Sequence, residues 1–203
     1  MLTRDGTYRK RLVRWESGVR FLTFSCHGRL PLLGNAKIRD VFVESLLRMR
    51  EEFDVTLYAW VVMPEHVHLL IRPDKSADRP LLWLKMSVAQ RVLNRWRELD
   101  SPLLSKLQVN GSPRFWLKGG GFDRNVRAEG EFSETVNYIH RNPVTRGLVE
   151  RPEDWTWSSV QWWMGKDTVE CDPPPPGVVQ RGSKRAWIEL KKALPPTDEP
   201  SEC

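Results

Sequence analysis

Two apolar segments separated by one short interruption constrain the fold of this chain more than any other feature. The segment Val55–Met63 is apolar on both of its alternating faces, which is typical of a central strand covered on both sides. Pro64 and Glu65 interrupt it, and the segment His66–Arg72 then resumes the strand pattern. We therefore predict a β-hairpin whose first strand is central in a sheet.

Further segments carry the periodicity of strands or helices. Runs rich in β-branched and aromatic residues predict strands, and apolar residues at spacings of three and four predict amphipathic helices. The predicted strands are Val19–Cys26 and Phe122–Val126, with a shorter piece at Phe115–Trp116. The predicted helices are Lys37–Phe53, residues 80–99 and Glu129–Asn142. Pro143 disfavours helical geometry in the preceding residue, so the third helix is expected to end near Asn142.

Each predicted helix has an apolar stripe that should face the core. The stripes are Phe42, Leu46, Met49 and Phe53 in the first helix, Leu82, Met86, Ala89, Leu93 and Trp96 in the second, and Phe132, Val136 and Ile139 in the third. The element order is strand, helix, strand, strand, helix, strand, helix. This order predicts an α+β fold, a ferredoxin-like split βαβ sandwich whose antiparallel sheet carries helices on one face.

Charge and composition narrow the class of protein. The chain has 203 residues, a formal charge of +6 and a pI near 9.4, so its field attracts polyanions such as nucleic acids. Its three cysteines are an odd number without close spacing, which favours a reducing compartment over a disulfide framework. No apolar stretch approaches the roughly 20 residues of a membrane helix. We expect a cytoplasmic, nucleoid-associated protein without a membrane partner.

The chain divides into three parts by composition. Residues 1–18 form a basic arm with Arg9, Lys10, Arg11 and Arg14, which either lies along a phosphate backbone or is a solvated terminus. Residues 19–157 form the expected catalytic domain. Residues 158–203 are an extension that begins with a packed, tryptophan-rich stretch and ends in proline-containing, charged sequence expected to be disordered.

His66 and His68 are the first candidate site residues. They stand two apart in a predicted strand, so both imidazoles project from one face while Val67 points to the other. This arrangement can present two nitrogen ligands to a divalent metal ion. Two structural or surface histidines would give the same pattern.

Tyr138 and Asn142 are the second pair. They stand four apart on the third helix and are therefore neighbours on one face. A tyrosine hydroxyl can attack a phosphodiester when a metal ion positions and neutralises the phosphate, and an asparagine carbonyl can complete the coordination of that ion. The alternative is a tyrosine packed on the sheet and an asparagine that caps the helix. His140 points away from the Tyr138 face, and we exclude it from the site.

Two separated motifs resemble those of a known family. They are the stretch from Trp60 to His68, WVVMPEHVH, and the stretch from Tyr138 to Val149, YIHRNPVTRGLV. Together with Phe115-Trp116 and Phe122-Asp123 they resemble the REP-associated tyrosine transposases, which are single-tyrosine HUH transposases, over residues 19–157. The glycine run at residues 119–121 and the tail after Trp157 depart from shorter relatives.

The resemblance implies a nuclease and strand transferase of single-stranded DNA that acts on palindromic hairpins, with a helix-borne catalytic tyrosine. In this family the paired histidines, here His66 and His68, bind Mg²⁺ or Mn²⁺, and the tyrosine, here Tyr138, forms a 5′-phosphotyrosine and frees a 3′-hydroxyl. Related enzymes carry glutamine as a third ligand where this chain has the shorter Asn142. The protein is expected to act as a monomer or a homodimer.

Candidate DNA contacts are the basic arm together with Arg114, Lys118 and Arg124, while Trp15 or Trp116 could stack an unpaired base. Asp123 is more consistent with a structural role than with a role in the site. His27 is expected to have no role in the site. Two other functions stay open. One is a non-catalytic module that binds hairpin DNA to organise or regulate repeats, and the other is a replication initiator or relaxase with the same histidine and tyrosine chemistry.

Overall fold

The structure, a computed structural model, describes residues 18–119, 121–166 and 168–175. Its centre is a four-stranded antiparallel sheet in the order β2-β3-β1-β6. These strands are β1 (Val19–Ser25), β2 (Thr56–Val62), β3 (His66–Arg72) and β6 (Phe122–Val126). With the long helices between them they form the β-α-β-β-α-β plan of a ferredoxin-like fold, which confirms the predicted fold class.

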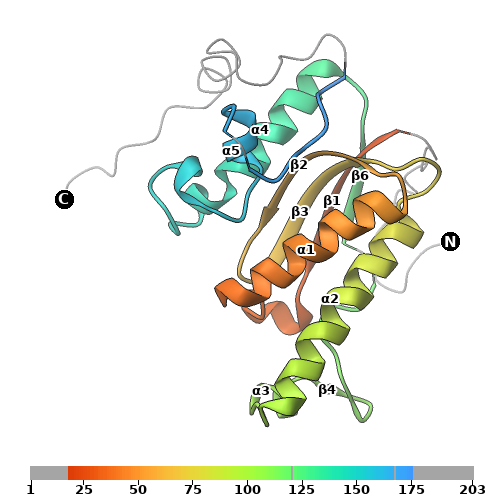
Figure 1. The fold of residues 1–203 in the computed structure, drawn as a ribbon, viewed down its shortest axis with the longest axis vertical. Helices are drawn as coiled ribbons and strands as arrows, with labels where there is room; N and C mark the ends of the chain where they lie inside the picture. The colour runs from red at the N-terminus through yellow and green to blue at the C-terminus, as the bar shows by residue number, and fades with distance from the viewer. Residues whose placement is uncertain (1–17, 120, 167, 176–203) are drawn as a thin grey trace, which may run out of the picture.

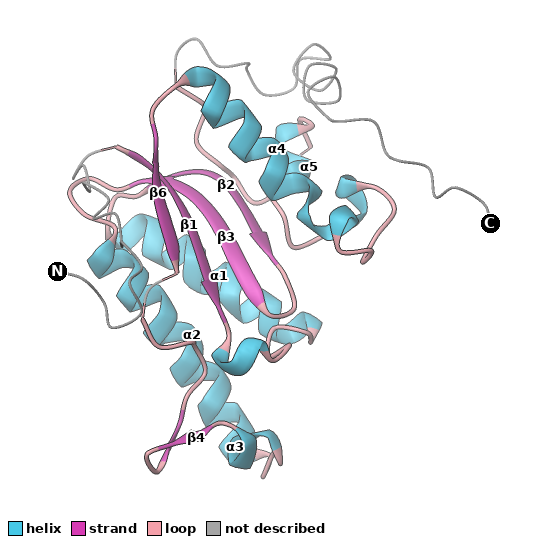
Figure 2. Cartoon of the chain, turned by 180° about the vertical axis from the view of Figure 1, so that it is seen from behind, coloured by secondary structure: helices cyan, strands magenta, loops and turns pink. Residues whose placement is uncertain are grey.

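The long helices cover both faces of the sheet (Figures 1 and 2). They are α1 (Ala36–Glu52), α2 (Asp78–Glu98) and α4 (Glu129–Thr145). In β1, Phe24 contacts Phe42 of α1, whereas Phe21 contacts Tyr138 of α4. Alternate residues of a strand point to opposite faces, so α1 and α4 lie on opposite sides. The predicted placement of all helices on one face is wrong.

Short elements complete the described chain. They are η1 (His27–Arg29), α3 (Leu103–Lys106), β4 (Gln108–Val109), β5 (Ser112–Pro113), η2 (Pro152–Asp154) and α5 (Val160–Trp163). β4 and β5 form a small separate hairpin that the sequence pattern did not predict. The predicted piece at Phe115–Trp116 is reduced to a single bridge between Trp116 and Cys26. In the described ranges, no helix is long and apolar enough to cross a membrane.

β2 lies at an edge of the sheet and is not central as predicted. Its side chains are nevertheless buried, because the chain after α4 runs along its free edge. Trp157 accepts from the Val62 amide at 2.9 Å, and the Ser159 amide donates to the Trp60 carbonyl at 3.0 Å. Further on, the Asp172 carboxylate accepts from the Leu57 amide at 2.7 Å. These hydrogen bonds satisfy backbone groups at the free edge of β2. They explain why an edge strand has the apolar sequence that is typical of a central one.

The orientation of α2 also differs from the prediction. The side chains of Leu82 and Met86 are 60% and 61% exposed, although we expected both in the core. The buried side runs through Leu84, Val88 and Val92, and it includes Leu93 and Trp96 of the predicted stripe. α2 carries two apolar stripes, and a helix can turn only one toward the sheet. By contrast, the predicted stripe of α4 and most of that of α1 are buried.

α4 continues one turn beyond the predicted end near Asn142 and contains Pro143. Its end is set by Gly147, whose positive φ of 64° is readily adopted only by glycine. The amide of Gly147 donates to Val144 and that of Leu148 to Pro143, both at 2.9 Å, which is the Schellman pattern. Pro143 has no amide to donate to the carbonyl of Ile139, and the helix ends within one turn of it, with Arg146 as the C-cap residue.

Candidate active site

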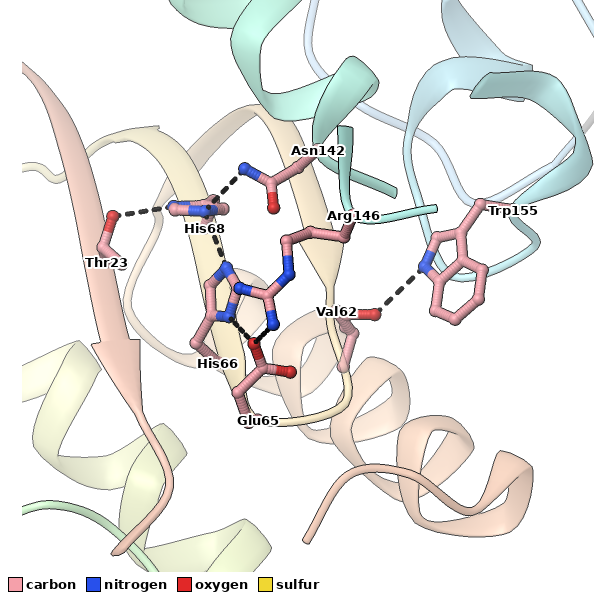
Figure 3. Close-up of polar contacts among 8 residues, drawn as sticks. All are labelled: Thr23, Val62, Glu65, His66, His68, Asn142, Arg146 and Trp155. Carbon is pink, nitrogen blue, oxygen red and sulfur yellow. Dashed lines mark hydrogen bonds and ion pairs between the residues drawn. The ribbon is translucent and has the colours of Figure 1, made fainter. Parts of the chain in front are cut away.

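His66 and His68 project from the α4 face of β3 toward a common point, as the sequence predicted (Figure 3). Their Nε2 atoms lie 3.0 Å apart and their rings meet edge to face. Val67, between them, is fully buried on the opposite face, where it pairs with Phe24. The strand periodicity thus separates the two imidazoles from the apolar core.

The second nitrogen of each ring has a partner of its own. The Nδ1 of His66 lies 3.2 Å from Oε1 of Glu65, and the Nδ1 of His68 lies 2.7 Å from the hydroxyl of Thr23. A carboxylate only accepts, so Nδ1 of His66 is the donor and its Nε2 carries a lone pair. Nε2 of His68 accepts from Nδ2 of Asn142 at 3.2 Å, which places its ring proton on Nδ1 as well. Two nitrogen lone pairs therefore face each other.

Burial keeps both imidazoles neutral. Loss of solvation and, to a smaller extent, the neighbouring His66 together lower the pKa of His68 from 6.5 to about 3. Loss of solvation also lowers the pKa of His66, against the opposing charge of Glu65. Neutral imidazole is the form that binds metal ions, so the pair is in the ligating state near pH 7.

α4 brings Tyr138 and Asn142 to the same histidines. The ring of Tyr138 stands edge-on to His68 at 5.2 Å between centroids and edge-on to Phe21 at 5.8 Å. Its side chain is 52% exposed, so it is open to a large ligand, whereas Asn142 is buried. The alternative in which the Asn142 side chain caps the helix is wrong, because its amide contacts His68 instead.

Three residues of the site were missed by sequence reasoning. Thr23 and Glu65 hold the histidine rings, and Arg146 forms an ion pair of 2.8 Å with Oε1 of Glu65. The pair ties the end of α4 to the β2–β3 turn (Figure 3). Arg146 follows Tyr138 and Asn142 at successive spacings of four, a signal that would have placed it on the same helical face. No local pattern marks Thr23, because its contact depends on the register of β1 against β3.

The candidate DNA contacts are scattered. Arg124 lines a pocket with Tyr138 and is ion-paired with Glu131 at 2.6 Å. Trp116 is buried, with its ring on Phe24 and its Nε1 donating to the Lys85 carbonyl at 2.7 Å, so it packs the core. Arg114 and Lys118 lie between β5 and β6 and do not line that pocket. The basic-arm residues Arg9, Lys10, Arg11 and Arg14, and also Trp15, lie outside the described residues.

Two residues set aside from the site have structural partners. The imidazole of His140 is buried on the other side of α4, where Nε2 lies 2.9 Å from the hydroxyl of Ser159. Asp123 is ion-paired with Arg20 across the β1–β6 pairing. Both placements agree with the roles expected from the sequence.

The spacing of the two histidine nitrogens fits adjacent positions in the octahedral coordination of a divalent cation. Two ligands at right angles, each about 2.1 Å from an ion, are about 3.0 Å apart, which matches the separation of the two Nε2 atoms. Rotation of the Asn142 amide would exchange its nitrogen for a carbonyl oxygen at the same point. Among the described residues, no group of three His, Cys, Asp or Glu side chains could hold a metal. Within the part of the chain that the structure describes, an ion here would be held by His66, His68 and Asn142.

Known proteins have sequences similar to that of this chain. The sequence model of a family described as Transposase IS200 like matches residues 21–141. A REP-associated tyrosine transposase of Escherichia coli (strain K12) is 23% identical over 146 residues, which are 71% of this chain and 77% of that protein. A putative REP-associated tyrosine transposase of Haemophilus influenzae is 25% identical over 114 residues, 54% of this chain and 61% of that protein.

A solved structure shows the same fold. A REP-associated tyrosine transposase bound to a REP hairpin superposes with a TM-score of 0.60 and 17% identity, over 88% of this chain and 97% of that chain. This likeness shows that the two chains share a fold.

Proposed function

The chain belongs to the family of IS200-like transposases, enzymes that act on DNA, and we propose that it nicks and rejoins single-stranded hairpin DNA with Tyr138 as nucleophile. One observation supports this most strongly: the ring of Tyr138 lies 5.2 Å from that of His68, whose Nε2 is 3.0 Å from that of His66. A half-exposed nucleophile thus stands beside two neutral nitrogens. The relative seen with a REP hairpin makes hairpin DNA the substrate class to test.

The proposal includes a Mg²⁺ or Mn²⁺ ion held by His66, His68 and Asn142. The lone pairs of the two Nε2 atoms face each other at 3.0 Å, an arrangement that a cation between them would stabilise. Thr23 and Glu65 fix the ring orientations through the two Nδ1 atoms. When bound, the ion neutralises phosphate oxygens and favours attack on phosphorus.

Tyr138 carries out the covalent step. Its Oη forms a bond to phosphorus as the bond from phosphorus to the 3′ oxygen breaks, and the hydroxyl proton passes to solvent. The products are a 5′-phosphotyrosine and a free 3′-hydroxyl. Attack by a 3′-hydroxyl on the phosphotyrosine reverses the step and joins strands, because the energy of the original bond is kept in the intermediate.

Denaturing gel analysis tests this function. Purified protein is incubated with single-stranded hairpins from its own genomic flanks, with Mn²⁺ or with EDTA. We expect a protein–DNA adduct that requires metal and is lost in Tyr138→Phe, while Tyr138→Phe still binds the hairpin and the control Tyr58→Phe, in the buried part of β2, still forms the adduct. An adduct in Tyr138→Phe would exclude Tyr138 as the nucleophile. Tight binding without an adduct would favour the non-catalytic hairpin-binding module.

A further inference from the structure

An open pocket of about 380 Å³ lies beside Tyr138, which forms part of its wall. Three elements form it: β1 contributes Phe21, β6 contributes Phe122 and Arg124, and α4 contributes Glu134, Thr135 and Tyr138. We propose that this pocket receives one unstacked DNA base from a nucleotide next to the scissile phosphate. The inference rests on the proposed function and names a specificity subsite for it.

The aromatic walls suit a base. Phe122 is 52% exposed, and its ring stands edge-on to Phe21 at 5.9 Å between centroids. Phe21 in turn stands edge-on to Tyr138 at 5.8 Å. An exposed phenylalanine at the rim of a pocket leaves a ring face on which a base can stack, and such stacking is tolerant of sequence.

The charges of the pocket select a base over a phosphate. The guanidinium of Arg124 is engaged with Glu131 at 2.6 Å and with the hydroxyl of Thr135 at 3.2 Å, so its charge is compensated. Glu134 lines the pocket and is exposed, so a carboxylate remains there. A carboxylate repels a phosphate and accepts from an exocyclic amino group. We therefore expect guanine, adenine or cytosine to be preferred to thymine.

The position of the pocket ties base selection to the cleavage point. Tyr138 both lines the pocket and contacts His68. A base held against one side of the nucleophile places a phosphate of the same nucleotide, or of its neighbour, near the hydroxyl. The pocket would thus decide which phosphodiester of a single-stranded flank is attacked.

A binding selection tests the inference. The hairpin that gives an adduct with the wild-type protein is synthesised with a randomised single-stranded flank and selected for binding to Tyr138→Phe, which cannot cleave it. We expect one flank position to be enriched in bases that carry an amino group. Adding Phe122→Ala should remove the enrichment and weaken binding of the selected sequence about tenfold. Adding Glu134→Gln should change which base is preferred while leaving the position enriched.

Two variants on the opposite side of the sheet serve as matched controls. Leu82→Ala removes a similarly exposed apolar side chain from α2, and Glu51→Gln neutralises an exposed carboxylate of α1; both should leave the selection unchanged. A flank without an enriched position, or an enrichment that survives both Phe122→Ala and Glu134→Gln, would overturn the pocket assignment although the wild type still forms its adduct. If no hairpin gives an adduct, the proposed function itself fails, and the inference falls with it.

Discussion

The two faces of the central sheet use the same strands for different purposes. Toward α1 and α2, the strands present Leu22, Phe24, Val67 and Leu69, all fully buried and apolar. Toward α4, the same strands present Phe21, Thr23, His66 and His68. The first face holds the fold together through burial, whereas the second holds a polar cluster in which both Nδ1 atoms have partners and the two Nε2 lone pairs face each other.

Core and site are separated by a single residue position along β3. In β3 the change from His66 to Val67 to His68 moves the side chain from one face to the other and back. A shift of one residue in register would bury both imidazoles in the core and expose the valine. The register is fixed by the apolar face, so stability on one side sets the geometry on the other.

The largest expected effect comes from the polar face. His68→Ala removes one of the two proposed imidazole ligands and should slow adduct formation on the order of a thousandfold, because a bound ion contributes several kcal/mol to the transition state. The protein should still melt cooperatively. Timed denaturing gels with Mn²⁺ measure the rate. Undiminished adduct formation would show that the α4 face is not the site of metal-dependent chemistry.

The adjacent residue tests the apolar face. Val67→Ala removes two buried methyl groups and should lower the free energy of unfolding by roughly 2 kcal/mol, or the melting temperature by roughly 4–8 °C. Adduct formation per folded molecule should be unchanged. Thermal melts followed by circular dichroism give the first quantity and gels at low temperature the second. A loss of chemistry without a loss of stability would contradict the separation of the two faces.

A smaller effect is expected from a residue that only positions a ligand. Glu65→Gln removes the charge that pairs with Arg146 and weakens the hold on His66, so Mn²⁺ affinity should fall about tenfold to a hundredfold. Titration of Mn²⁺ followed by calorimetry measures this, with Glu51→Gln on α1 as the matched control. Equal affinities in the two variants would leave Glu65 without a positioning role.

The last prediction concerns the dependence of the free energy of unfolding on pH, where the difference between wild type and variant is a change of slope. Burial lowers the pKa of His68 and of His140 from 6.5 to about 3, so both stay neutral in the folded chain while the unfolded chain takes up protons below about pH 6.5. Stability is therefore fully present above that pH and falls as the pH drops toward 3, by up to about 1.4 kcal/mol per pH unit for each histidine. Urea unfolding between pH 7 and 5 measures the slope. His68→Ala should show a shallower slope, and equal slopes would contradict the neutral, buried state of His68.

Local geometry explains what the sequence could predict. The spacing of two in a strand placed His66 and His68 on one face, and the spacing of four in a helix placed Tyr138 beside Asn142. The order of strands and helices was also readable, because each element carries its own periodicity.

Contacts between distant segments explain the errors. The sequence of β2 is typical of a central strand because its edge is covered by residues after α4, which lie about a hundred positions further along the chain. Part of the buried side of α2 was misjudged because two apolar stripes compete, and packing against the distant helix α1 and the sheet decides which of them is buried. Gly121 is another such case: a Cβ there would lie 1.4 Å from the Thr23 carbonyl oxygen, so only glycine allows this crossing beside the site.

The central claim is that Tyr138 attacks DNA beside the histidine pair, and identification of the residue that carries the DNA tests it most directly. The adduct formed with Mn²⁺ is trimmed with nuclease, digested with protease and mapped by mass spectrometry. The account predicts a nucleotide attached through its 5′-phosphate to the peptide that contains Tyr138. A nucleotide on any other residue, or attachment through a 3′-phosphate, would contradict it.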